Sequence, residues 1–257
     1  MATFRTLAMA LGMLIAVLVG QNVIGTFISS SQTMSLGHED PANKPTQADY
    51  DRLDRIIGEL AVAAGKGDSW RPRMVIKPSI LPQAYATNSE VGVTIGLMRM
   101  CNDAELAFVM GHEMTHMLED HMVKSIFPRL LVLLLSFMLV VTGIVAIPLA
   151  FWRENHGKMA LYLWLVIGVL ALSSFADSQI SQANERAADR GAILLTGNAT
   201  AGADALQKLK DMKRPKDMPY TPMLGQVIWN RAFPSHPPLS ARIDALRAEA
   251  NSIRSVR

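Results

Sequence analysis

The stretch from Gly111 to His116 contains residue types that can hold a metal ion and activate water. It reads Gly-His-Glu-Met-Thr-His, which contains an HExxH motif. On a helix, His112 and His116 stand four residues apart, so both imidazoles leave the same face and can bind one Zn²⁺. The Glu113 carboxylate projects beside them, where it reaches a water on the metal rather than the metal itself. The motif therefore indicates a zinc peptidase with two ligands and a general base.

The residues before the motif predict the helix that must carry it. Asn102 is a helix cap, and Glu105 follows three residues later as the acid of a capping box. Leu106, Val109 and Met110 then supply an apolar side. The alternative is a polar helix face that carries these residues by chance, but the chain has only six histidines, so a chance HExxH is rare. We therefore place the motif in the middle of a helix, about two turns after its start.

Composition limits the classes of function. The chain has 257 residues, half of them hydrophobic, and a net charge of +3 without a long basic block. This length fits one catalytic domain plus membrane segments, and the charge pattern gives no indication of nucleic-acid binding. The single cysteine, Cys101, excludes an internal disulfide, and we interpret it as a core or strand-end residue rather than a nucleophile.

Three apolar runs predict membrane segments. Residues 1–30 contain the first, which follows Arg5 and is either a retained signal anchor, the interpretation we favour, or a cleaved signal peptide. The second and third, Leu130–Trp152 and Met159–Ala176, are 23 and 18 residues without a charge. We interpret residues 127–177 as an inserted transmembrane hairpin; the alternative is a buried helical pair in a soluble core.

The remaining residues predict a mainly helical α+β peptidase domain in two parts, 31–126 and 178–257. The first part has a helix capped by Thr46, a small sheet and the HExxH helix. Its strands are expected at Arg71–Ile76, Gln83–Thr87 and Val91–Leu97. The last of these is either an edge strand, to which a peptide substrate could add, or an ordinary internal strand. The second part has a helix ended by Gly197 and further helices over Ala201–Lys213 and Leu239–Ile253.

A catalytic zinc needs a third protein ligand and an open position for water. The metzincin pattern requires Gly at 119 and His at 122, but the chain has Glu119 and Met122. Glu185 fits instead: it lies on a helix expected to begin just after the hairpin, and an even number of membrane crossings returns it to the side of His116. The alternative is a solvated helix face shared with Arg186 and Arg190. Asp189 lies one turn later on the same face, where it could accept a hydrogen bond from a zinc-bound imidazole.

Taken together, these motifs resemble the zinc metallopeptidase family of the heat-shock protease HtpX and the CAAX prenyl endopeptidases. The similarity covers about residues 46–248. The segments that carry it are Thr94–Leu97, Ala104–His116, Asn184–Asp189, Ser235–Pro238 and Arg242-Ile243.

The resemblance implies a zincin-like fold and a role for each matching residue. His112, His116 and Glu185 would hold one Zn²⁺ per chain, Glu113 would be the catalytic base, and Asp189 would support a ligand. His236 falls in a His-Pro loop, where stabilising the oxyanion, gating the metal and fixing a turn are all open. His121 matches a histidine common after the motif, and we interpret it as structural.

The same resemblance implies a membrane-bound endopeptidase that acts on membrane or envelope proteins in quality control. HtpX-like members carry two spans before the catalytic helix, whereas this chain shows one. With Arg5 inside, a single anchor predicts an extracytoplasmic catalytic domain in a multi-pass protein of a bacterial cell membrane. The partners expected are a polypeptide and the lipid bilayer. The alternative is a non-catalytic or latent membrane protein with a structural zinc site.

Overall fold

The computed structural model describes residues 43–67, 70, 72–87, 89–120, 134, 138, 156–212, 227–228, 231–234 and 236–256. Contacts divide the chain into two units, which we describe separately. The first comprises residues 1–32, 124–181 and 219–235, and the second residues 33–123, 182–218 and 236–257. The expected anchor at 1–30, nearly all of the first hairpin span and His121 lie outside the described residues.

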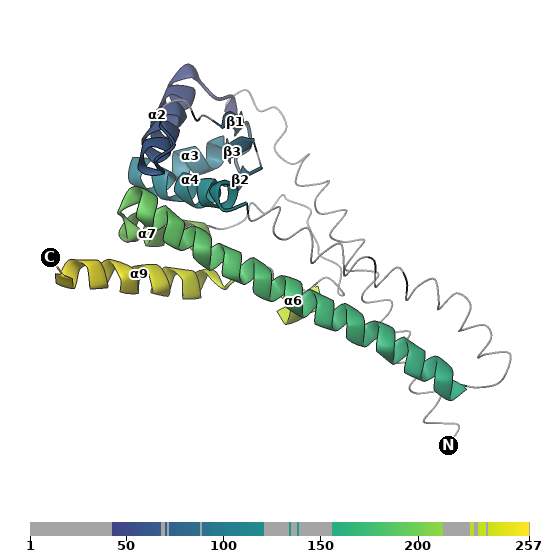
Figure 1. Cartoon of the computed structure of the whole chain (residues 1–257). Helices are drawn as coiled ribbons and strands as arrows, with labels where there is room; N and C mark the ends of the chain where they lie inside the picture. The colour runs from purple at the N-terminus through teal and green to yellow at the C-terminus, as the bar shows by residue number, and fades with distance from the viewer. Residues whose placement is uncertain are drawn as a thin grey trace. The chain divides into compact units, whose positions relative to one another are not determined.

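The second unit begins with the predicted capped helix, α2 (Gln47–Ala63) (Figure 1). Thr46 and Asp49 form a capping box, in which the Thr46 side chain accepts from the Asp49 amide and the Asp49 carboxylate accepts from the Thr46 amide. The chain leaves the helix through Gly65, whose φ of +68° is the left-handed conformation that favours glycine. Both predicted ends of this helix are therefore confirmed.

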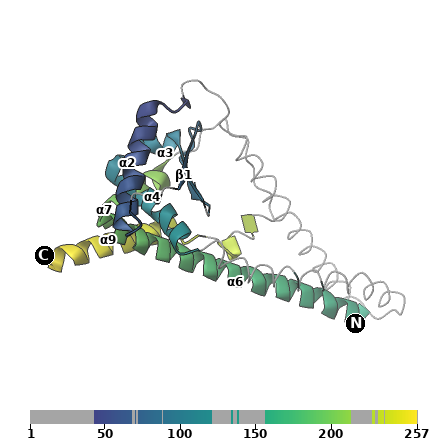
Figure 2. The same cartoon turned by 45° about the horizontal axis from the view of Figure 1, so that its top comes forward.

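A three-stranded sheet follows, made of β1 (Arg73–Lys77), β2 (Ala84–Ala86) and β3 (Glu90–Thr94). The strand order is β1-β3-β2, as labelled in Figure 1, with β1 parallel and β2 antiparallel to β3. Figure 2 shows the sheet, labelled at β1, beside the helices of the unit. The three strands predicted from sequence are all present. The edge-strand alternative for Val91–Leu97 is wrong, because β3 is the central strand and has partners on both sides.

The predicted third strand also extended too far. β3 ends at Thr94, and the next residues form the short helix α3 (Ile95–Met100). The Thr94 side chain accepts from the Leu97 amide and so caps this helix. Gly96 faces the backbone of Ile80 so closely that a Cβ there would collide with it. A cap and a close backbone approach therefore outweigh the strand preference of this apolar run.

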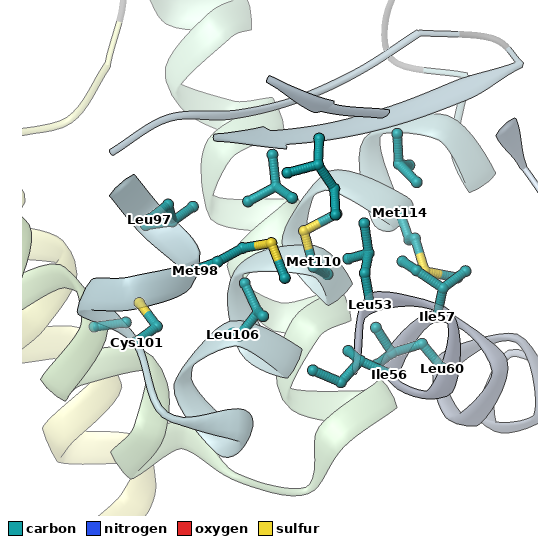
Figure 3. Packing of buried hydrophobic residues seen from close by; sticks show 14 of the residues in the cluster. Leu53, Ile56, Ile57, Leu60, Leu97, Met98, Cys101, Leu106, Met110 and Met114 are labelled. Atoms are coloured by element: carbon teal, nitrogen blue, oxygen red, sulfur yellow. The ribbon is translucent and has the colours of Figure 1, made fainter. Parts of the chain in front are cut away.

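The HExxH motif lies on α4 (Asp103–Leu118), which begins at the predicted capping box of Asn102 and Glu105. Its apolar side contributes Met110 and Met114 to a core shared with α2 and the sheet (Figure 3). Leu53 and Ile57 of α2 are fully buried in the same cluster. This packing holds α4 against the rest of the unit, so the histidines project from a fixed surface.

The next described helix, α6 (His156–Thr196), is continuous over 41 residues. The second predicted span, Met159–Ala176, and the predicted third-ligand helix are therefore one helix, and the latter does not begin after the former. No proline interrupts the sequence between them, and the helix ends only where Gly197 has a φ of +65°. Within the described residues, α6 alone is long and apolar enough to cross a membrane.

Two further helices complete the second unit. They are α7 (Ala199–Asp211) and α9 (Leu239–Val256), both predicted from sequence. A second buried cluster joins them to α4 and to the end of α6; its members are Phe108, Ala192, Ala203, Leu206, Ile243 and Leu246. Gly202 faces the Phe108 ring without room for a side chain, which lets α7 approach α4 closely. The described chain is thus mainly helical with one small sheet, as predicted.

Candidate active site

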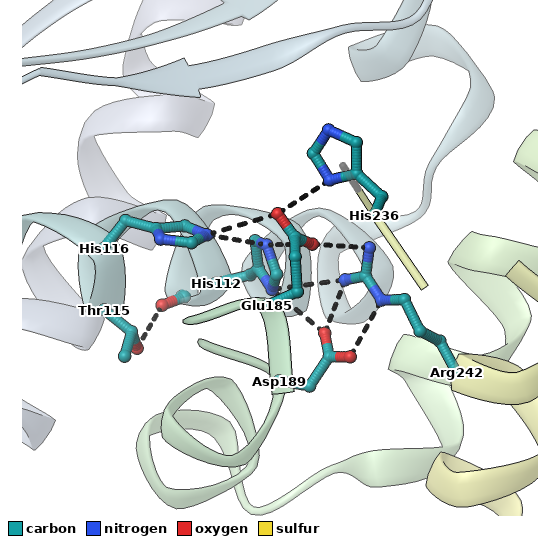
Figure 4. A network of polar contacts seen from close by, with 8 residues as sticks. His112, Thr115, His116, Glu185, Asp189, His236 and Arg242 are labelled. Carbon is teal, nitrogen blue, oxygen red and sulfur yellow. Dashed lines mark hydrogen bonds and ion pairs between the residues drawn. The ribbon is translucent and has the colours of Figure 1, made fainter. Parts of the chain in front are cut away.

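Three side chains that are far apart in sequence meet between α4 and α6 (Figure 4). The ligand atoms of His112, His116 and Glu185 all lie within 4.8 Å of one another. The Nε2 atoms of the two histidines are 3.2 Å apart. The two oxygens of Glu185 lie 3.5 Å from His112 Nε2 and 3.8 Å from His116 Nε2. The structure therefore brings together the three residues that the sequence indicates as ligands.

These separations fit a zinc ion. With Zn–N and Zn–O bonds of about 2.0–2.1 Å, two ligand atoms at tetrahedral corners stand about 3.3 Å apart. The observed separations of 3.2–3.8 Å are close to that edge length. Two imidazoles and one carboxylate are also the ligand set of catalytic zinc sites that keep one corner open. The residues present therefore fit the ion that the sequence implies.

Asp189 lies behind the site and contacts a histidine rather than the ligand atoms. Its Oδ1 is 3.0 Å from His112 Nδ1. A proton on Nδ1 that is donated to this carboxylate leaves the Nε2 lone pair free to bind a metal. Both side chains are almost fully buried, at 7% exposure for His112 and 8% for Asp189. This is the geometry that a supporting role for Asp189 requires.

Arg242 on α9 is a site residue to which the sequence assigned no role. Its guanidinium binds Asp189 in a bidentate manner, with Nε 2.8 Å from Oδ2 and Nη2 2.6 Å from Oδ1. Its Nη1 lies 2.9 Å from Oε2 of Glu185. Only 11% of the Arg242 side chain is exposed, and this one guanidinium orients two carboxylates. The available signal was its position six residues after His236, in the motif that carried the family resemblance.

His236 lies at the outer side of the site. Its Nδ1 is 2.9 Å from Oε1 of Glu185, and 64% of its side chain is exposed. The ring therefore reaches the ligand carboxylate from the solvent side. From this position the ring can contact a substrate or the metal ion, and it can also hold its own loop in place.

A cleft of about 190 Å³ opens beside these residues. Glu113, the candidate base, lines it next to His112 and Glu185. Gln83, just before β2, and Ala84, its first residue, also line the cleft. Within the described chain, β2 pairs only with β3, so its other edge is unpaired. The free sheet edge at the cleft is thus β2 rather than the Val91–Leu97 stretch.

Comparison with known proteins identifies the family. Residues 47–250 match the model of Peptidase family M48. The chain belongs to this family. It is similar to protease HtpX homolog 1 of Streptomyces coelicolor, with 29% identity, covering 77% of this chain and 70% of that protein. It is also similar to the protease HtpX homolog of Pyrococcus furiosus, with 30% identity, covering 76% of this chain and 72% of that protein.

The structural comparison gives a distant match. The crystal structure of S. mikatae Ste24p aligns with a TM-score of 0.48 and 18% identity. The alignment covers 95% of this chain, which spans 65% of the length of Ste24p. The family resemblance read from the sequence is confirmed by the M48 match, and the chain is a metalloprotease.

The electrostatics of this M48 site favour charged carboxylates. Burial opposes ionisation, but hydrogen bonds from His112 and His236 lower the pKa of Glu185 well below its usual value. The pKa of Asp189 is lowered in the same way, with His112 and Arg242 outweighing burial. Burial alone would lower the pKa of His112, but its bonds to Asp189 and Glu185 raise that pKa to about 9. The charged carboxylates of Glu185 and Asp189 attract a cation, either a proton or a metal ion.

The environment of the Glu113 carboxyl, in contrast, favours its neutral form. Burial raises the pKa of its carboxyl above the usual value, although the charge on His112 opposes this. A raised pKa makes a carboxylate a stronger base, which suits proton transfer near neutral pH. The environment of Glu113 therefore differs from that of Glu185, its neighbour in the cleft.

Proposed function

We propose that this chain is a zinc-dependent endopeptidase of a bacterial membrane, with His112, His116 and Glu185 as ligands of one Zn²⁺. The proposal rests on the separations of the ligand atoms of these three residues, which match the edges of a tetrahedron around zinc. It rests also on the adjacent cleft, which Glu113 lines. Such a donor set holds a metal while leaving one coordination position open.

Each residue then has a task in peptide-bond hydrolysis. A Zn²⁺ held by His112, His116 and Glu185 would supply a Lewis acid for the scissile carbonyl and would make a bound water more acidic. Glu113 accepts the proton of the attacking water and later donates it to the leaving amine. His236 faces the cleft and is placed to donate to the carbonyl oxygen as that oxygen gains charge. Asp189 and Arg242 keep His112 and Glu185 in orientation.

The substrate main chain would lie along β2. Ala84–Ala86 has one edge without a strand partner among the described residues, and Ala84 lines the cleft. An extended peptide added there would form main-chain hydrogen bonds that do not depend on its sequence. This fits an endopeptidase of broad specificity, which quality control of membrane or envelope proteins requires.

The membrane assignment draws support from α6. The window of this helix that is apolar enough to span a bilayer contains no buried residue. Large side chains such as Leu161, Leu172 and Phe175 are each more than half exposed, which is unfavourable in water. We therefore retain the organisation proposed from sequence, with an anchor or signal peptide at 1–30, a hairpin at 127–177 and peptidase parts at 31–126 and 178–257.

Proteolysis by wild type and Glu113→Gln tests the catalytic role. We expect the wild-type chain in detergent to cleave an unfolded protein such as casein, and the variant to lose at least about a hundredfold in rate because general-base catalysis contributes about 10²–10⁴-fold. The variant should keep its zinc, since Glu113 is not a ligand. Equal cleavage by both proteins would remove Glu113 from the mechanism.

The alternative is a latent or structural zinc site that His236 closes as a fourth ligand. The 2.9 Å contact between His236 Nδ1 and Glu185 favours this possibility, because the ring already reaches the ligand carboxylate. The same assay separates the two proposals. A zinc-loaded wild-type chain that cleaves no polypeptide would favour the latent site and contradict the endopeptidase.

A further inference from the structure

A second cavity lies between the end of α6 and α9, outside the catalytic cleft. It has a volume of about 470 Å³, and its walls include the apolar side chains of Ile193, Leu194, Ala245 and Leu246. Leu194 is 84% exposed, which is unusual for a leucine on a packed helix. An apolar groove with an exposed leucine beside it is typical of a surface that a partner covers.

Charged side chains also line this groove. Arg186 and Arg190 lie four residues apart on α6, and Glu249 lies on α9. Both arginines are exposed, and neither has an ion-pair partner in the described part of the chain. The charges opposite to those of the arginines would therefore come from a bound partner.

The direction of the two helices gives the positions of these charges. Arg242 on α9 contacts Asp189 on α6, and Leu246, one turn further along α9, packs in the cluster that contains Ala192. The two helices therefore run in the same direction along the groove. The first arginine, Arg186, lies near one end and Glu249 near the other.

The shape and charges of the groove select the kind of occupant. The nine residues of α6 from Arg186 to Leu194 extend about 12 Å, a little over two helical turns. A concave surface needs a convex partner, so a second copy that presented the same groove would not fit. An anionic lipid offers a phosphate headgroup and a tail, which leaves Glu249 unmatched. A polypeptide can carry an acid and a base at a fixed spacing, with apolar residues between them.

We propose that the groove between α6 and α9 docks a short amphipathic helix of a partner protein. Its apolar ridge contacts Leu194 and Leu246, its acidic end lies beside Arg186 and Arg190, and its basic end lies beside Glu249. This is the helix-in-groove mode of recognition, with anchors at i, i+3, i+4 and i+7.

The groove also contacts the supports of the candidate metal site. Asp189 and Arg242 line it, and the same two residues hold His112 and Glu185. A docked helix would therefore contact the pair that orients two proposed ligands. Docking itself does not depend on catalysis, so it can be measured in a chain that cannot cleave the partner.

The test uses the full chain carrying Glu113→Gln, purified in detergent, and two fluorescent helical peptides of about fourteen residues. Both have a leucine ridge; one has glutamates at one end and lysines at the other, and the second has lysines at both ends. We expect the first peptide to bind and the second to bind weakly. Arg186→Glu combined with Arg190→Glu should weaken the first about tenfold and strengthen the second. Leu194→Asp should weaken both.

Arg247→Glu combined with Arg254→Glu is the matched control, because it changes the charge equally on α9 outside the groove. It should leave the affinity for the first peptide unchanged. Failure of the first peptide to bind, or equal binding to the parent and to the Arg186/Arg190 variant, would overturn the proposal. Binding of phosphatidylglycerol vesicles through the same arginines, without peptide binding, would assign the groove to lipid and would also overturn it.

Discussion

At the scale of single residues, the site depends on how its carboxylates are held. Glu185 Oε2 contacts Arg242, and Asp189 is bound by Arg242 and His112 together. A carboxylate that is fixed in this way loses little side-chain entropy when it binds a metal. Residues that only contact ligands can therefore change metal affinity substantially.

Replacing the guanidinium tests this directly. Arg242→Lys keeps the positive charge but cannot bind Asp189 in a bidentate manner and reach Glu185 at once. We expect zinc affinity, measured by competition with a chelator, to fall about tenfold to a hundredfold. Arg247→Lys, an exposed arginine on the same helix, is the control and should bind zinc as wild type does. Equal affinity in both variants would show that Arg242 has no part in positioning the ligands.

Sequence reasoning reached only some of these residues. Spacing of four residues on a helix predicted that His112 lies beside His116 and Glu185 beside Asp189, whereas Glu185 was chosen as third ligand by excluding the metzincin pattern and by the family resemblance. The structure brings these four side chains together. Arg242 could not, because its contacts arise where α9 packs against α6, 53 positions from Asp189. The sequence marked Arg242 only as part of the Arg242-Ile243 segment that carries the family resemblance, without a role.

At the scale of elements, the spacing between α4 and α6 sets the distance from the histidines to Glu185. Gly191 on α6 faces the side chain of Thr115 on α4, and a Cβ there would collide with it. Thr115 is buried and donates its hydroxyl to the Gly111 carbonyl, with a separation of 2.8 Å. It therefore cannot easily move aside, and the glycine permits the close approach.

Two glycine substitutions make a matched pair on this contact. Gly191→Ala should destabilise the protein by about 1–3 kcal/mol, because it overpacks the contact between the helices. Gly111→Ala places its Cβ 3.5 Å from its nearest neighbours, which is ordinary contact, so stability should stay the same or rise through helix propensity. Thermal unfolding of both variants in detergent checks this. An equally stable Gly191→Ala variant would show that the contact is not tight.

The elements also show where sequence patterns are ambiguous. The cap residues of α2 and α4 were evident, because Thr46 and Asn102 stand before an acid at the third helical position. The place of β3 in the sheet was not, because alternation of apolar residues says nothing about pairing order. The continuity of α6 was missed since a change from apolar to polar residues does not interrupt backbone hydrogen bonds.

At the scale of the whole molecule, the side of the membrane that carries the peptidase decides which proteins it can reach. The charge near the N-terminus predicts an extracytoplasmic domain. The chain offers a clean way to test this. Cys101 is its only cysteine and is buried, and burial raises the pKa of its thiol to about 11. It should therefore react slowly with maleimides.

Asp204→Cys places a thiol on an exposed position of α7. In cells whose inner membrane is intact, we expect a membrane-impermeant maleimide to label this variant and to leave the parent chain unlabelled. Detergent permeabilisation supplies the control for total reactivity. Labelling that appears only after permeabilisation would place the peptidase in the cytoplasm.

The central claim is that α4 and α6 together hold one catalytic zinc. The most direct measurement is the zinc content of the purified full chain, determined by mass spectrometry for wild type and for Glu185→Ala. The account predicts about one zinc per wild-type chain and a large loss in the variant, because two histidines alone bind zinc weakly. An unchanged zinc content in Glu185→Ala would contradict it.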